Sequence, residues 1–274
     1  MSLCLNCVCY TIKGRDVNQN RYIQIFNMWL SQLMLCGDLQ ASDAIYFYSD
    51  TETIKYLQSD TSHTAIVDKL KCTFKIFSHP PPECLADGMM LRFGFNEYTQ
   101  DIYMYCDIDV LIVNSLHSVT NSMKPNTIYV HNEGLLTDKN YGAAFQQYEL
   151  EKFVATSPGF SSGKFFIYGK ELHKMFFSAL LNLYTTLSDK TFYTADQPYF
   201  NKIVYHFMNN KICNVDLISL QSSIKSNLIT RFTNNTVFID LYGVPGDGEF
   251  HFNKMIKYYI LLRSGIIGQS ISAK

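Results

Sequence analysis

Ile102-Tyr-Met-Tyr-Cys-Asp-Ile-Asp-Val-Leu-Ile-Val113 is an apolar run that contains two carboxylates, Asp107 and Asp109. An apolar run without polar alternation predicts a strand that is buried on both faces, as at the centre of a mainly parallel sheet. In an extended chain, side chains two residues apart point the same way. We therefore expect Asp107 and Asp109 to share one side of the strand, with Ile108 turned towards the core.

Two like charges in an apolar setting are costly unless another charge neutralises them. A divalent cation would do so, and carboxylate oxygens suit Mn²⁺ or Mg²⁺. Because open α/β sheets bind ligands at the carboxyl ends of their strands, a nucleotide diphosphate is expected beside such an ion. The plainer interpretation is that one aspartate caps the next segment and the other is solvated at a strand end.

The composition is typical of a globular protein, since 47% of the 274 residues are hydrophobic and 17% are charged. The net charge of -1 and the absence of a Lys/Arg block argue against general nucleic-acid binding. No apolar run approaches the roughly 18 residues of a membrane span, and the N-terminus does not resemble a signal peptide. The scattered cysteines fit reduced, buried thiols, so we expect a cytoplasmic protein.

Strands alternate with helical patterns before the acidic run. Strands are predicted at 5–12, 44–48 and 74–77, ahead of the acidic strand at 102–113. A first helix, capped by Asp16 or Asn18 and ended by Gly37, a short helix after Thr51 and a helical stretch at 83–98 lie between them. This order predicts βαβ units, and therefore an α/β fold with a mostly parallel central sheet flanked by helices.

The second half has a different pattern. Strands are predicted at 127–130, 163–168 and 236–242, helices at 170–187, 196–209 and 250–262, a surface excursion at 132–162 and a tight loop at 244–248. No repeat or linker separates the halves, so we expect one domain, 1–274, with a nucleotide-sugar-binding half, 1–113, and an acceptor-binding half, 114–274. The first half has no glycine-rich phosphate loop, so metal chelation by Asp107 and Asp109 would have to hold the phosphates.

Five patches can be considered together, and they carry a resemblance to a known family. They are Arg92, Tyr105-Cys-Asp-Ile-Asp109, Phe160-Ser-Ser-Gly163, Asp196-Gln197 and His251-Phe-Asn-Lys-Met-Ile-Lys257. Their order and spacing resemble the glycogenin-like and lipopolysaccharide galactosyltransferase-like enzymes of glycosyltransferase family eight, which have the GT-A fold. The likeness covers most of the chain.

The individual motifs match this family with some departures. The acidic pair takes the place of the family's Tyr-Leu-Asp-x-Asp, and Ser161 replaces Asn in its Phe-Asn-Ser-Gly. The last patch resembles His-Phe-x-Gly-x-x-Lys-Pro-Trp, with Lys254 for Gly and Tyr258-Tyr259 for Pro-Trp. Tyr10 and Thr11 match only loosely the position at which members of this family contact the base of the nucleotide.

The resemblance implies a metal-dependent transferase that moves a sugar from a nucleotide-diphosphate donor, a UDP-sugar, to a glycan or protein acceptor with retention. It implies that Mn²⁺ or Mg²⁺ is bound by Asp107, Asp109 and His251. The donor would be bound by Tyr10, Thr11, Arg92, Asp107, Ile108, Asp109 and Lys257. The acceptor would be bound by Ser161, Ser162 and Gly163, and the groups at the reacting sugar would be Asp196 and Gln197.

Each of these residues also has a plainer interpretation. Asp196 is equally suited to cap a helix, the serines to form a polar turn, and His251 to be an ordinary, partly buried histidine. Arg92 and Lys257 fit a solvated helix face. Three other functions stay open: a haloacid-dehalogenase-like phosphatase, a sugar nucleotidyltransferase, and a glycan-binding protein that keeps the fold without catalysis.

Overall fold

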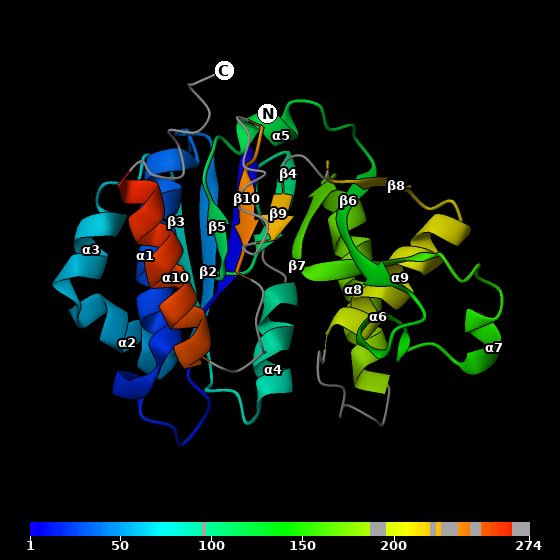
Figure 1. Cartoon of the computed structure of the whole chain (residues 1–274), viewed down its shortest axis with the longest axis horizontal. Helices are drawn as coiled ribbons and strands as arrows, with labels where there is room; N and C mark the ends of the chain where they lie inside the picture. The colour runs from blue at the N-terminus through cyan, green and yellow to red at the C-terminus, as the bar shows by residue number, and fades with distance from the viewer. Residues whose placement is uncertain (95–96, 187–195, 220–222, 226–234, 242–247, 265–274) are drawn as a thin grey trace.

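A seven-stranded sheet runs through the whole molecule (Figure 1). The computed structural model describes residues 1–94, 97–186, 196–219, 223–225, 235–241 and 248–264. The strand order is β3-β2-β1-β4-β7-β6-β8, so strands from both halves of the chain share one sheet. The strands are β1 (Leu3–Val8), β2 (Ala44–Asp50), β3 (Thr73–His79), β4 (Ile102–Cys106), β6 (Thr127–Leu135), β7 (Pro158–Tyr168) and β8 (Asn214–Leu217).

The sheet is mostly parallel, as predicted. β3, β2, β1 and β4 pair in parallel, and β6 pairs in parallel with β8. Within the described part of this seven-stranded sheet, only β7 runs antiparallel to its neighbours, β4 and β6. Parallel strands bring their carboxyl ends to one edge, so the chain leaving β1 and the chain leaving β4 meet there.

Helices cover both faces of this sheet (Figure 1). One face carries α1 (Arg21–Cys36), α2 (Thr51–Ser59), α3 (Thr61–Val67) and α10 (Gly248–Arg263), and the other carries α8 (Lys170–Thr186) and α9 (Gln197–Asn209). The shorter helices are η1 (Val17–Gln19), α4 (Leu85–Met90), η2 (Leu91–Phe93), α5 (His117–Thr120), α6 (Lys139–Gly142) and α7 (Gln147–Leu150).

Two hydrophobic clusters fill the space between the sheet and its helices. Along β4, Met104 packs into the cluster under α1 and α10, whereas Tyr103 and Tyr105 pack into the cluster under α8 and α9. Successive strand residues point to opposite faces, so a strand that is covered on both sides needs apolar residues at every position. All five residues of β4 are buried, which agrees with the sequence-based expectation.

The acidic run is not one strand, and here the sequence-based expectation is wrong. The chain turns after β4, with the Val110 N–H donating to the Asp107 carbonyl at 3.1 Å. β5 (Val110–Ile112) then enters a second sheet of three strands with β10 (Phe238–Asp240) and β9 (Ser223–Lys225), in the order β5-β10-β9. Asp107 and Asp109 therefore lie on a turn between two sheets, while Ile108 is buried as expected.

Several other boundaries differ from the predicted ones. The helical stretch predicted to reach residue 98 ends with η2, and the excursion at 132–162 contains the end of β6, α6, α7 and the start of β7. Phe160–Gly163 therefore lies inside a strand. The cap of α1 is Asn20 and neither of the two predicted residues, Asp16 and Asn18; Asp16 caps η1 instead. The expectations for 187, 242 and 244–247 lie outside the described residues.

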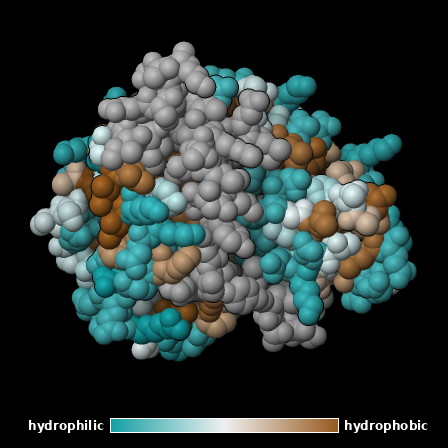
Figure 2. All heavy atoms as spheres, viewed as in Figure 1, coloured by the Kyte–Doolittle hydropathy of each residue, from teal (hydrophilic) through white to brown (hydrophobic). Residues whose placement is uncertain are grey.

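Hydrophilic residues cover much of the described surface in the view of Figure 2, with smaller hydrophobic patches between them. Among the described helices, none combines the length and the apolar character needed to cross a membrane.

Candidate active site

A cavity of about 920 Å³ opens where the chain leaves β1 and β4. The start of α9, the start of α10 and residues 161–164 of β7 complete its walls. The structure brings nearly all the residues predicted for the site into this one lining, and the exception is Lys257. The predicted residues that line the cavity are Tyr10, Thr11, Arg92, Asp107, Ile108, Asp109, Ser161, Ser162, Gly163, Asp196, Gln197 and His251.

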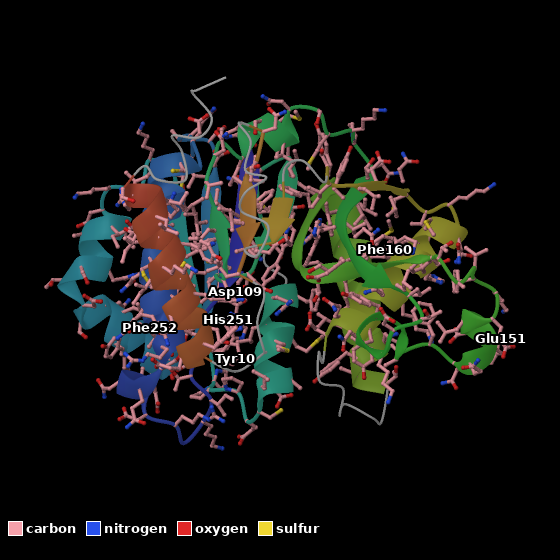
Figure 3. All side chains as sticks on the ribbon, in the orientation of Figure 1. Tyr10, Asp109, Glu151, Phe160, His251 and Phe252 are labelled. Carbon is pink, nitrogen blue, oxygen red and sulfur yellow. The ribbon has the colours of Figure 1, made fainter. Side chains whose placement is uncertain are left out.

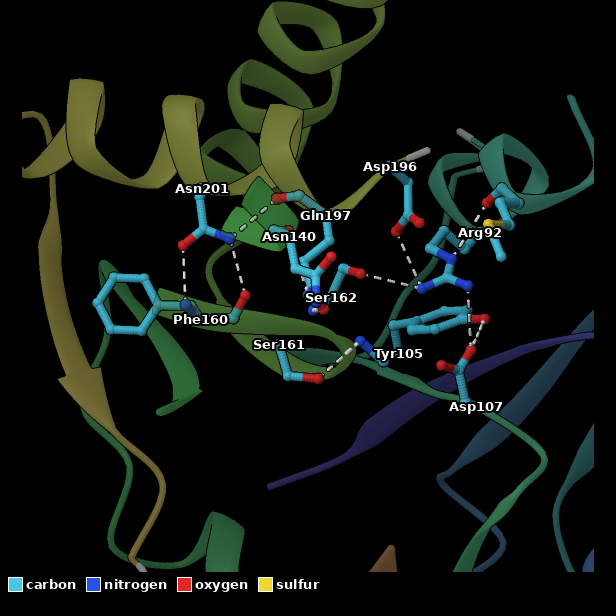
Figure 4. Close-up of polar contacts among 12 residues, drawn as sticks. Arg92, Tyr105, Asp107, Asn140, Phe160, Ser161, Ser162, Asp196, Gln197 and Asn201 are labelled. Atoms are coloured by element: carbon cyan, nitrogen blue, oxygen red, sulfur yellow. Dashed lines mark hydrogen bonds and ion pairs between the residues drawn. The ribbon is translucent and has the colours of Figure 1, made fainter. Parts of the chain in front are cut away.

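Arg92 lies at the centre of the polar contacts (Figure 4). Its Nη2 is 3.3 Å from Asp107 Oδ1, and its Nη1 is 3.0 Å from Asp196 Oδ2. The guanidinium also donates to Ser162 Oγ at 3.2 Å and to the Met89 carbonyl at 3.1 Å. Because the side chain is only 10% exposed, it is not the solvated helix residue of the plainer interpretation. It connects the acidic turn, β7 and the start of α9.

Asp107 is held in place from three sides. The Tyr105 hydroxyl donates to Asp107 Oδ1 at 2.6 Å, and the Arg92 guanidinium lies 5.0 Å from the centre of the Tyr105 ring. Burial raises the pKa of Tyr105, so its hydroxyl stays a donor. A Cβ at Gly163 would lie 2.5 Å from Asp107 Oδ2, so the strand beside this carboxylate has room only for glycine.

Asp196 occupies the N-cap position of α9, but its side chain makes no capping hydrogen bond. It faces Arg92 instead, which speaks against a helix cap as its role. Burial raises the pKa of Asp196, and the positive charge of Arg92 opposes that rise.

Gln197 and Asn201 fasten α9 to β7 (Figure 4). The Ser162 N–H donates to Gln197 Oε1 at 3.2 Å, and Gln197 Nε2 donates to the Asn140 carbonyl at 3.3 Å. Asn201 accepts from the Phe160 N–H and donates to the Phe160 carbonyl, both at 2.8 Å. These bonds hold the start of α9 against β7 beside Arg92, whose Nη1 contacts both Asp196 and Ser162.

Asp109 faces the other wall of the cavity, towards α10 (Figure 3). Its Oδ2 lies 3.3 Å from His251 Nδ1, and the His251 side chain is only 3% exposed. Burial and the nearby charge of Asp107 raise the pKa of Asp109 to about 6, while His251 opposes the rise. A carboxylate in this setting would be stabilised by an added cation.

The three predicted metal ligands do not come together as a set. Asp109 and His251 are neighbours, but Asp107 Oδ1 is directed at Arg92 and Tyr105. Within the part of the chain that the structure describes, no group of three or more His, Cys, Asp or Glu side chains is arranged to hold a metal ion. The residues as placed thus offer two protein ligands to a divalent ion.

Lys257 lies outside the cavity lining. It is exposed on α10, with its Nζ 5.6 Å from the centre of the Tyr258 ring. The segment from His251 to Lys257 is helical, so residues six apart differ by about two-thirds of a turn around the helix axis. Lys257 is therefore exposed and apart from the residues that line the cavity, and its role in donor binding stays a prediction.

Two charged residues that the sequence analysis did not single out also line the cavity. Lys164 on β7 contacts both carboxylate oxygens of Asp240 on β10, at 2.7 and 2.9 Å. Each is the one charged residue of its strand. This is the same signal that drew attention to Asp107 and Asp109.

The second half of the chain contributes a polar wall to the cavity. The sequence analysis did not single out the residues of this wall. Glu133, Asn140 and Tyr141 line it, and the Tyr141 ring leaves no room for a Cβ at Gly134 or Gly159, which face each other in the β6–β7 pair. These residues fall in the 132–162 stretch, whose weak periodicity gave no sign of a defined wall.

The arrangement of the sheet and its covering helices matches the fold of a known glycosyltransferase. The structure of the WbbM bifunctional glycosyltransferase in its apo form superposes on this chain with a TM-score of 0.58 at 10% sequence identity. The match covers 96% of this chain and 51% of that one, so the chain spans about half the length of this neighbour. No protein-family model matches the chain, and no curated protein matches it either.

Proposed function

We propose that this protein is a glycosyltransferase that moves a sugar from a nucleotide-diphosphate donor, a UDP-sugar, to a glycan or protein acceptor. The observation that carries the proposal is that one cavity contains the acidic turn, Asp107–Asp109, and the Arg92–Asp196 pair. The fold favours this function over a haloacid-dehalogenase-like phosphatase.

The donor side of the cavity is the edge where β1 and β4 end. Tyr10 packs against Gly88, and Thr11 is tied to the start of α2 by its N–H bond to Asp50 Oδ2 at 2.7 Å. A nucleotide at this edge would place its base near Tyr10 and Thr11 and its diphosphate near Asp107–Asp109, as expected for ligands of open α/β sheets.

The charge of the lining supports a bound cation. The described lining contains seven carboxylates, Asp16, Asp107, Asp109, Glu133, Asp196, Asp240 and Glu249, but only four Arg or Lys residues, Arg15, Arg21, Arg92 and Lys164. An anionic diphosphate would be repelled by this excess of negative charge. We propose that Asp109 and His251 hold a Mn²⁺ or Mg²⁺ ion, whose Lewis acidity would stabilise the charge on the departing diphosphate.

The reaction itself exchanges one bond at the sugar C1. The acceptor oxygen forms a bond to C1, the C1–O bond to the diphosphate breaks, and its electron pair leaves with the diphosphate. The hydroxyl proton of the acceptor passes to the departing diphosphate, which is compatible with retention. Asp196 and Gln197 would orient sugar hydroxyls beside the reacting carbon, and Ser161, Ser162 and Gly163 would contact the acceptor.

Calorimetric titration with UDP tests the donor site. The native protein is expected to bind UDP in the presence of Mn²⁺, and Asp109→Ala and Asp107→Ala are each expected to weaken binding at least tenfold. Asp216→Asn, at an exposed position on β8, is the control variant and is expected to bind like the native protein. Absence of UDP binding, or equal binding by all four proteins, would contradict the proposed donor site.

A further inference from the structure

Lys164 is the one lysine among the described residues that line the cavity. Its side chain is only 2% exposed. In the β4–β7 pair it lies opposite Cys106, the residue that precedes Asp107. The backbone therefore fixes the Lys164 side chain beside the start of the acidic turn.

Asp240, on the three-stranded sheet, lies beside the same turn. It lies opposite Val110 in the β5–β10 pair, and the Leu241 N–H donates to the Asp109 carbonyl at 3.1 Å. The contact between Lys164 and Asp240 thus joins the two sheets directly beside Asp107–Asp109. His131 Nε2 is 3.9 Å from Asp240 Oδ2.

Stability does not account for a buried charge pair at this position. Desolvating an ammonium and a carboxylate offsets most of their attraction, and apolar residues in place of such a pair are often neutral or stabilising. The aromatic ring of Phe238, 5.5 Å from Lys164 Nζ, adds only a modest cation–π contribution. A buried ammonium on a cavity wall is, however, well suited to bind an anion, because charge interactions weaken little where water is excluded.

We propose that the Lys164 ammonium contacts the diphosphate of the donor, which gives Lys164 the kind of donor-binding role that the family resemblance implies for Lys257. The inference depends on the proposed function. Arg92 contacts the acidic turn through Asp107, and Lys164, which is itself paired with Asp240, is a second buried cation beside the same turn. The ammonium would stabilise the negative charge that the diphosphate gains as the bond to the sugar breaks.

The test compares inorganic pyrophosphate, UDP and uridine as ligands in the presence of Mn²⁺. Lys164→Met is expected to weaken binding of pyrophosphate and of UDP at least tenfold by calorimetry, and to leave uridine binding, followed by ligand-detected NMR, unchanged. Lys202→Met is the matched control. Lys202 forms an ion pair with Glu149 at 2.8 Å, and neither residue is part of the cavity lining.

A second pair of variants keeps the test decisive if Lys164→Met leaves a destabilising, uncompensated carboxylate. Asp240→Asn alone retains the lysine, and Asp240→Asn combined with Lys164→Met removes both charges. We expect the double variant to bind pyrophosphate at least tenfold more weakly than Asp240→Asn. Equal pyrophosphate binding by these two variants would overturn the assignment of Lys164, as would a parallel loss of uridine binding in Lys164→Met. Either result would leave the proposed function in place, whereas failure of the native protein to bind UDP would refute the proposed function itself.

Discussion

At the scale of single residues, Arg92 is the side chain on which the site geometry depends most. Its ion pairs with Asp107 and Asp196 bring together two carboxylates that would otherwise repel each other. The family resemblance implied a donor-binding role for Arg92, but a single sequence does not show that Asp107 and Asp196, both of which follow Arg92 in the chain, converge on it.

Replacing Arg92 by Met is expected to destabilise the fold, because the buried Asp196 and the half-buried Asp107 lose their shared counter-charge. Removal of one partner from a buried ion pair costs about 3–5 kcal/mol. Urea unfolding of Arg92→Met should show a loss of this order. Lys13→Met, which breaks the exposed pair with Glu83 (63% and 70% exposed), is the control and should change little. Equal stability of Arg92→Met and the native protein would contradict the central position of Arg92.

His173 predicts how stability depends on pH. Its ring is buried against those of Tyr103 and Phe177, with ring centres 4.1 Å apart in both cases, and burial lowers its pKa to about 3. In the unfolded chain it would titrate near pH 6.5. Between these two values only the unfolded state takes up the proton, so this residue lowers stability as the pH falls below about 6.5, by up to roughly 1.4 kcal/mol per pH unit.

Urea unfolding at pH 7.5 and at pH 5.5 checks this effect. His173→Phe should lose less stability between the two conditions than the native protein does. His206→Phe, at an exposed position, is the control. An identical loss in His173→Phe and the native protein would show that His173 does not contribute to acid sensitivity.

At the scale of elements, the long helices and most of the strands could be predicted because their burial patterns are local, whereas β8 and β9 were not predicted. The apolar stripe of α1, the largely apolar run of β1 and the uninterrupted apolar run of β4 are visible in short windows of sequence. The turn at Asp107–Asp109 could not be predicted in this way. Two short buried strands of different sheets, joined by one turn, have the same apolar pattern as one long strand. What distinguishes them is a distant contact, the bond from the Asp107 N–H to the Gly163 carbonyl at 2.7 Å.

Gly163 tests whether this contact between β7 and the turn matters for function. A methyl group there would collide with the Asp107 carboxylate, so Gly163→Ala is expected to displace Asp107 and to weaken UDP binding at least tenfold. Thermal unfolding should confirm that the variant is folded. A folded Gly163→Ala protein with native UDP affinity would show that the position of Asp107 is not critical.

At the scale of the whole molecule, the site lies where the two sheets meet and where the two halves of the chain share a wall. The motifs that carry the family resemblance come from distant parts of the sequence, and all of them except Lys257 reach the cavity. Lys164, Asp240 and Glu133 were missed because a lone charge in a strand or loop gains meaning only when its neighbours in space are known. The narrower membership in family eight stays a prediction, since the comparison supports the fold alone.

The most direct test of the account is nucleotide release from a panel of UDP- and GDP-sugars in the presence of Mn²⁺. The account predicts that the native protein releases UDP from at least one UDP-sugar, and that a variant with both Asp107→Asn and Asp109→Asn does so at least a hundredfold more slowly. No release from any donor, or release that the double variant matches, would contradict a glycosyltransferase site at the acidic turn.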